Sequence, residues 1–153
     1  MAIRRYKVNP SVTASSAYDA YDVVGGLLKF DGLRNGTLQS ISICDNAAQN
    51  VNYVIVLFDS IVSVINDKDE FDISDAALDE IIFIGGMAAA TYRWAFKDNS
   101  IHLATGLSVP LSSAGGSVYG FLVTTSTPTY AATSDITVTL QVKDFDTVKA
   151  FEV

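Results

Sequence analysis

The sequence has few of the features that mark disulfide-stabilised, membrane-spanning or secreted proteins. It contains one cysteine, Cys44, so it cannot form an internal disulfide and must fold by packing alone. The longest apolar runs, at 53–58 and 81–84, have the length of strands and fall far short of the roughly 20 residues of a membrane helix. The first residues, MAIRRYKVNP, lack the apolar stretch of a secretory signal. We therefore expect a chain that is made in the cytoplasm and does not bind a membrane.

Catalytic motifs are also missing. His102 is the only histidine, so any Ser-His-Asp or Cys-His centre would have to use it. The sequence has no G-x-S-x-G elbow, no phosphate-binding loop and no H-E-x-x-H motif. We interpret His102 as a strand residue and Cys44 as a small buried hydrophobe. The sequence predicts no catalytic residue, no cofactor and no enzymatic activity.

The densest acidic cluster is DKDEFDISD, residues 67–75. In a calcium loop of the EF-hand type, the sixth position is glycine and the twelfth is glutamate. Here Asp72 and Leu78 occupy those positions, so the pattern fails. An irregular calcium site is the alternative, because carboxylates alone suit that ion. We prefer a solvated loop that leads into a helix, and predict no metal site.

Charge is unevenly distributed along the chain. Residues 1–18 contain three basic residues and no acid, whereas the rest contains seven basic and 17 acidic residues. Because residues 19–153 are this acidic, they repel phosphate backbones, and we expect no binding to nucleic acid. The basic segment at residues 1–18 is suited instead to binding in an acidic groove.

The apolar periodicity is that of β-strands. In 136–143, Ile136 and Val138 alternate with Thr137 and Thr139, which predicts a strand with one buried face. Residues 118–123 carry large side chains on both faces and predict a strand covered on both sides. Further strands are expected at 22–30, 36–45, 51–58, 81–86, 92–96, 101–104 and 106–110.

Turn and cap residues complete this interpretation. DGLRNG, residues 31–36, contains Asp-Gly and Asn-Gly and predicts a hairpin-like link between two strands. Ser74 is placed to cap a short helix in SDAALDE, residues 74–80. The sequence predicts an all-β fold, a two-layer antiparallel β-sandwich of jelly-roll-like or Greek-key type with one short helix. We expect this single domain to span residues 21–153.

We predict that residues 1–20 form an extended N-terminal arm, because they show no sustained apolar periodicity and contain Pro10. Such a segment buries too little to be ordered alone, so we expect it to lie against its own sandwich, a sister subunit or another protein. Arg4, Arg5, Tyr6 and Lys7 are the candidate partner-binding residues, since Arg and Tyr are enriched in binding hot spots. The alternative is a solubilising tail.

Three aromatic residues alternate in TYRWAFK: Tyr92, Trp94 and Phe96. On a strand they would share one face, as in the aromatic platforms that bind carbohydrates. We prefer to place them in the core, because large aromatic side chains are rarely left exposed.

The chain resembles a family of small virion proteins of tailed bacteriophages, which includes capsid decoration (cement) proteins. The phrases that carry the resemblance are SSAYDAYDVVGGLLKF, GTLQSISICD, YVIVLFD, SDAALDEI and LVTTSTPTYAATSDITVTLQV. They extend over almost the whole chain and consist of strand and turn phrases, with no catalytic signature.

The resemblance implies a structural protein of the virion, located on the outer capsid surface and made in the host cytoplasm. Its partners would be the major capsid protein and further copies of itself, with a trimer favoured over a dimer. It would clamp neighbouring capsomers. The alternative is a carbohydrate- or receptor-binding virion module, such as a head fibre or tail component.

Overall fold

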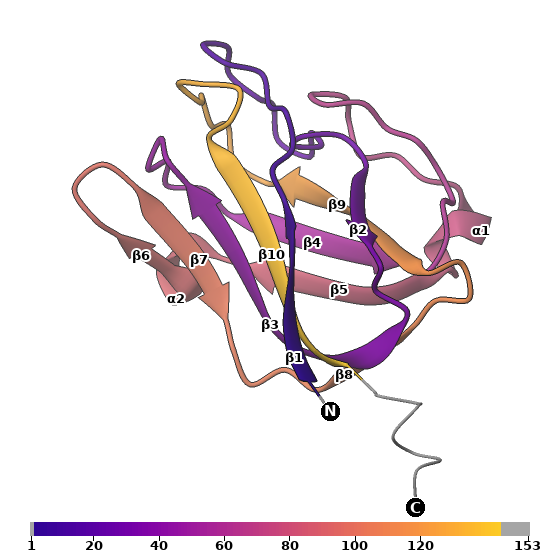
Figure 1. Cartoon of the computed structure of the whole chain (residues 1–153). Coiled ribbons are helices and arrows are strands. Elements are labelled where there is room, and N and C mark those ends of the chain that lie inside the picture. The colour runs from indigo at the N-terminus through magenta and orange to yellow at the C-terminus, as the bar shows by residue number, and fades with distance from the viewer. Residues whose placement is uncertain (1, 145–153) are drawn as a thin grey trace, which may run out of the picture.

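The computed structural model describes residues 2–144 and shows an all-β sandwich of two antiparallel sheets (Figure 1). The six-stranded sheet has the order β1-β10-β3-β7-β6, with β8 paired to the far end of β3, and the four-stranded sheet has the order β2-β9-β4-β5. The predicted fold class is confirmed. The strands are β1 (Ala2–Val8), β2 (Leu28–Asp31), β3 (Asn35–Asp45), β4 (Tyr53–Phe58), β5 (Ile81–Met87), β6 (Arg93–Ala95), β7 (Ser100–Ala104), β8 (Val109–Ser112), β9 (Ser117–Thr124) and β10 (Ile136–Asp144).

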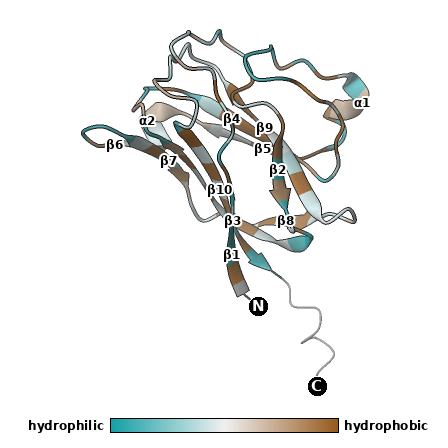
Figure 2. Cartoon of the chain, turned by 45° about the horizontal axis from the view of Figure 1, so that its top comes forward, coloured by the Kyte–Doolittle hydropathy of each residue, from teal (hydrophilic) through white to brown (hydrophobic). Residues whose placement is uncertain are grey.

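The core lies between the two sheets and follows from the alternation along each strand. In β10, Ile136, Val138, Leu140 and Val142 are fully buried. They pack with the inward residues of β3 and of the four-stranded sheet. Figure 2 shows this alternation as brown bands along the strands, separated by paler and teal residues.

Two short helices interrupt the strands. The predicted cap is confirmed: helix α1 (Asp75–Leu78) begins after Ser74, whose Oγ accepts a hydrogen bond from the Ala77 amide at 3.1 Å. Helix α2 (Ala89–Tyr92) was not predicted from the sequence, and it joins β5 to β6. Both helices are a single turn long and lie outside the core between the sheets (Figure 1).

The link between β2 and β3 differs from the predicted hairpin. β2 pairs with β9 and β3 pairs with β10, so residues 31–36 cross from one sheet to the other. Gly32 takes the positive φ of a turn, at +79°, whereas Gly36 lies within β3. A Cβ at Gly36 would lie 2.8 Å from the Lys143 carbonyl oxygen, so this glycine permits close approach of β10.

Residues 2–20 lie against their own sandwich, which is one of the three positions expected for the N-terminal arm. Residues 2–8 form β1, which pairs antiparallel with β10 from Ala2 opposite Asp144 to Val8 opposite Val138. Val12 and Tyr18 are buried in the core. β10 provides the backbone partners of residues 2–8, and carbonyl groups of residues 128–133 accept hydrogen bonds from the amides of Val12, Ser15 and Tyr18. Residues 1 and 145–153, which belonged to the predicted arm and domain, lie outside the described residues.

The Asp67 carboxylate helps to hold the chain between β1 and β2, in addition to backbone hydrogen bonds such as that from the Tyr18 amide to the Pro128 carbonyl oxygen at 2.8 Å. The Asp67 carboxylate oxygens accept hydrogen bonds from Tyr18 Oη at 2.7 Å, Thr13 Oγ1 at 2.7 Å and the Gly25 amide at 2.6 Å. The acidic cluster thus starts with a structural residue that joins two loops.

The outer face of the four-stranded sheet is covered by the segment that follows β4. Ile65 is buried there in a cluster with Phe58 and Phe121 of the sheet, and Phe71 and Ile73 pack against this cluster. The four-stranded sheet is therefore apolar on both faces, as the sequence predicted for residues 118–123. The outer face of the six-stranded sheet has no such cover among the described residues.

Candidate functional site: the outer face of the six-stranded sheet

The four predicted partner-binding residues lie on β1, and the strand divides them between its two faces. Arg4 and Tyr6 point toward the same side as the core. Both bind Asp144 at the end of β10: Tyr6 Oη lies 2.9 Å from Oδ2, and Arg4 Nε lies 3.0 Å from the same oxygen. Burial, aided by the Asp144 carboxylate, raises the pKa of Tyr6 to about 12. These two side chains therefore fasten β1 to its own sheet.

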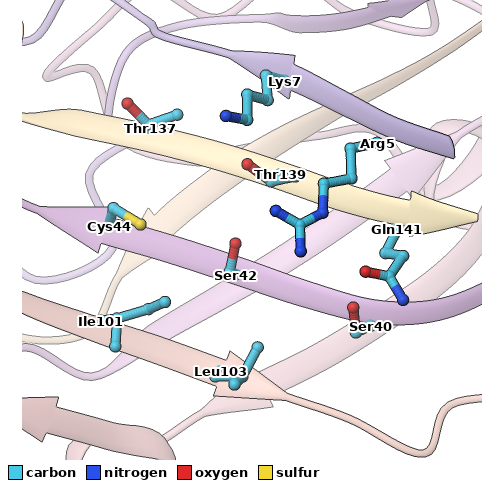
Figure 3. A pocket seen from close by; sticks show the side chains of 10 residues that line it. All are labelled: Arg5, Lys7, Ser40, Ser42, Cys44, Ile101, Leu103, Thr137, Thr139 and Gln141. Carbon is cyan, nitrogen blue, oxygen red and sulfur yellow. The ribbon is translucent and has the colours of Figure 1, made fainter.

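Arg5 and Lys7 point to the opposite side, onto the outer face of the six-stranded sheet. They line a hollow of about 440 Å³ (Figure 3). The two cations come from β1, hydroxyl and amide groups come from β10 and β3, and aliphatic side chains come from β7. The lining residues are Arg5, Lys7, Ser40, Ser42, Cys44, Ile101, Leu103, Thr137, Thr139 and Gln141. We call these ten residues the cationic face.

The strand register places the residues of the cationic face in rows across the sheet. One row runs Lys7, Thr139, Ser42, Leu103, and the next runs Arg5, Gln141, Ser40. Figure 3 shows the Arg5 side chain leaning across β10 toward β3. Each row therefore passes from a cation through hydrogen-bonding side chains, and the first ends in an aliphatic one.

No acidic residue projects from the outer side of this sheet within the described strands. Lys143 shares that side with Arg5 and Lys7, because it lies opposite Ile3 in the next row. Neither Arg5 nor Lys7 forms an ion pair within residues 2–144. The whole chain carries a net charge of −7, so the positive charge of this face contrasts with the net negative charge of the protein. Two unpaired cations on such a face attract an anionic partner.

An exposed aromatic residue extends the cationic face at its apolar side. Trp94 of β6 lies opposite Ile101 of β7 and is 66% exposed, and Phe96 is 67% exposed. The preferred prediction of a core position was wrong for both residues. Trp94 projects from the outer face of the six-stranded sheet, which no segment within residues 2–144 covers. Tyr92 lies in α2 and is partly buried against the core.

Cys44 lies within the cationic face and is partly buried. It stands opposite Thr137 on one side and Ile101 on the other. Burial raises the pKa of its thiol, and the nearby charge of Lys7 opposes that rise. The neutral thiol therefore dominates near pH 7, and Cys44 contributes to the face as a small, weakly polar side chain.

His102 is in a strand, as predicted, but its side chain faces the core. It has no exposed surface, and its Nε2 lies 2.6 Å from the Val51 carbonyl oxygen. Burial lowers its pKa, so the ring is neutral near pH 7. A substrate in solvent cannot reach this ring in the folded state. Its position is explained by packing against Tyr53, whose ring lies 4.9 Å away, edge to face.

The acidic cluster at 67–75 does not gather into a metal site in the structure. Within residues 2–144, no three His, Cys, Asp or Glu side chains are arranged to hold a metal ion. Asp67 is occupied by its three hydrogen-bond donors, and Asp75 starts α1. In the same part of the chain, no helix has the length and apolarity needed to cross a membrane.

No protein-family model and no curated protein matches this chain. The site is therefore defined by its geometry alone. Sequence reasoning identified Arg5 and Lys7 but missed Ser40, Ser42 and Thr139. The alternation in 136–143 indicated which residues of β10 face outward, but the pairing of β10 with β1 and β3 has no signal in a single sequence.

Proposed function

We propose that the protein is a structural component of a tailed-bacteriophage virion, a decoration protein that binds the outer surface of the capsid. The observation that carries the proposal is the cationic face: a sheet surface that, within residues 2–144, carries no acid and has no covering segment, on a protein with a net charge of −7. Such a surface is suited to an acidic area of the major capsid protein. The phage assignment rests on the strand and turn phrases that resemble those of small virion proteins.

Binding in this proposal uses shape and charge, without making or breaking bonds. Arg5 and Lys7 would provide long-range attraction and the outer charge contacts, while Trp94 and Leu103 would supply apolar contact area. Many copies on one particle would bind neighbouring capsomers together through weak individual contacts. The protein would thus be located on the outer surface of the virion.

The test is co-sedimentation with undecorated capsids, together with the melting temperature of the capsids. We expect the wild-type protein to sediment with the capsids and raise their melting temperature. In the variant Arg5→Glu/Lys7→Glu, affinity should fall about 10-fold or more, because two attractions become repulsions. Lys29→Glu is the matched control, since Lys29 is an exposed cation on β2 of the other sheet. A wild-type protein that stays in the supernatant would reject the proposal.

The exposure of Trp94 and Phe96 favours a second candidate, a carbohydrate- or receptor-binding module of the virion. An uncovered indole beside hydroxyl and amide groups can stack on a sugar ring while those groups bind its hydroxyls. A glycan array tests this candidate. Trp94→Ala should abolish any glycan signal, whereas Tyr21→Ala, at a similarly exposed aromatic position, should keep it. An array without wild-type signal excludes this candidate and leaves the first untouched.

A further inference from the structure

The stretch from Ile81 to Phe96, IIFIGGMAAATYRWAF, contains a single charged residue, Arg93. That residue is turned toward a neighbouring loop: its guanidinium donates hydrogen bonds to the carbonyl oxygens of Ala48, at 2.9 Å, and Gln49, at 3.2 Å. The stretch forms β5, α2 and β6, which lie along one side of the sandwich. This side of an acidic molecule therefore presents no outward charge from these elements.

β5 is the edge strand of the four-stranded sheet on this side. Within the described residues it pairs with β4 alone, so the other edge of its backbone is unpaired. Proteins normally protect such edges with charged residues, proline or a covering segment, because an open edge accepts another strand. The sequence of β5, IIFIGGM, has neither charge nor proline. Ile84, in the middle of the strand, is 60% exposed.

The other long edge strand, β1, is protected in the usual way. It carries Arg4, Arg5 and Lys7, and pairing it with a second copy of itself would bring like charges together. β5 has no such obstacle. A Cβ placed on Gly86 meets no atom within 4 Å, so the strand is also open to close approach there.

We infer that β5 pairs antiparallel with β5 of a second copy of the chain about a two-fold axis. The pairing would continue the four-stranded sheet across the dimer and cover Ile84. A second copy is the occupant that fits best, because the surface must be uncharged for two molecules of charge −7 to approach each other. A two-fold pairing gives a dimer, in contrast to the trimer that the resemblance favoured.

The inference does not depend on the capsid proposal, since it concerns the isolated protein. Sedimentation velocity over a range of micromolar concentrations should give a species of twice the 16.4 kDa chain mass. Ile84→Lys should weaken dimerisation at least about 10-fold, because it introduces a protective charge on the edge. Val64→Lys is the matched control: Val64 is 69% exposed but lies in the segment after β4, outside β5, and this variant should stay dimeric.

Hydrogen exchange on the wild-type protein gives an independent readout if Ile84→Lys fails to fold. Amides of residues 81–87 should become more protected as protein concentration rises, while those of residues 2–8 should not change. A monomer at all concentrations, a trimer, or a dimer that Ile84→Lys leaves intact would overturn the inference. Protection that increases in β1 in place of β5 would do the same.

Discussion

Tyr6 and Asp144 join the first and the last strands that the structure describes. The Tyr6 hydroxyl donates to the Asp144 carboxylate, with oxygen distances of 2.9 and 3.0 Å. The two residues are 138 positions apart in the sequence. This contact decides which side chains of β1 face solvent, because fixing Tyr6 on the inner side puts Arg5 and Lys7 on the outer side.

Removing the Tyr6 hydroxyl should loosen β1. We expect Tyr6→Phe to lower the free energy of unfolding by about 1.5–3 kcal/mol, the usual cost of losing a hydrogen bond to a charged acceptor. Urea unfolding measures this loss, and hydrogen exchange should become faster in residues 2–8. Arg5→Ala is the control, since Arg5 forms no ion pair within the described residues. Equal effects of the two substitutions would contradict the assigned role of Tyr6.

Alkaline pH should release the same contact. The pKa of Tyr6 is raised from 10.0 to about 12, so the folded protein favours the protonated phenol. The stabilisation from Tyr6 is fully present below pH 10 and is lost as pH rises through about 12. Comparing unfolding free energies of wild type and Tyr6→Phe from pH 9 to 12 tests this, because the difference between the two proteins should shrink. A constant difference would argue against it.

Acid pH should destabilise the protein through His102. Burial lowers the pKa of this ring below its ordinary value of 6.5, so the unfolded chain binds the proton more readily than the folded one. Stability is therefore intact above pH 6.5 and falls as the pH drops toward the folded-state pKa, by at most about 1.4 kcal/mol per pH unit. Urea midpoints between pH 7.5 and 5 measure the slope. His102→Gln should flatten it, and parallel slopes in both proteins would refute the assignment.

Tyr53 and Tyr130 hydrogen-bond to each other through their hydroxyls in the core. Burial raises the pKa of both phenols, so both stay protonated in the folded state. Tyr53→Phe leaves the Tyr130 hydroxyl without this partner and should cost about 1–3 kcal/mol. The double variant Tyr53→Phe/Tyr130→Phe should cost less than the sum of the single variants, because it removes both polar groups. Additive costs would show that the two hydroxyls are not coupled.

Gly120 of β9 lies opposite Leu57 of β4, where the two strands leave no room for a side chain. A Cβ there would lie 2.5 Å from the Val56 carbonyl oxygen and 2.8 Å from Leu57 Cδ2. Gly120→Ala should therefore force the strands apart and destabilise the protein by about 2–3 kcal/mol, seen as a melting temperature several degrees lower. Gly86→Ala is the matched strand control, because its Cβ meets nothing within 4 Å. Equal melting temperatures for the two variants would contradict this packing.

Much of the fold could be predicted from local signals in the sequence. The alternation of apolar residues in 136–143 and the two apolar faces of 118–123 are confirmed in β10 and β9, as is the Ser74 cap. Each of these depends on residues within one turn or one strand. The sequence thus carries strong information about elements and about which side of an element is buried.

Errors arose where the outcome depends on distant residues. Asn35-Gly36 has the composition of a tight turn, but here the glycine makes room for the Lys143 carbonyl of β10. Trp94 and Phe96 have the spacing of core residues, yet β6 lies at the edge of its sheet. The cationic face likewise needs four strands, β1, β10, β3 and β7, to lie side by side. Its members are ordinary serines and threonines until the pairing is known.

The position of β10 between β1 and β3 has a consequence for the order of events during synthesis. β1 is made before β10 and must wait with its backbone unpaired until residues 136–144 have been made, because they form its neighbour. The pairing of β1 and β3 with β10 thus forms late, through contacts between distant parts of the chain, which is a slow route. A nascent chain stalled before that strand would leave β1 and one edge of β3 free to associate with other polypeptides.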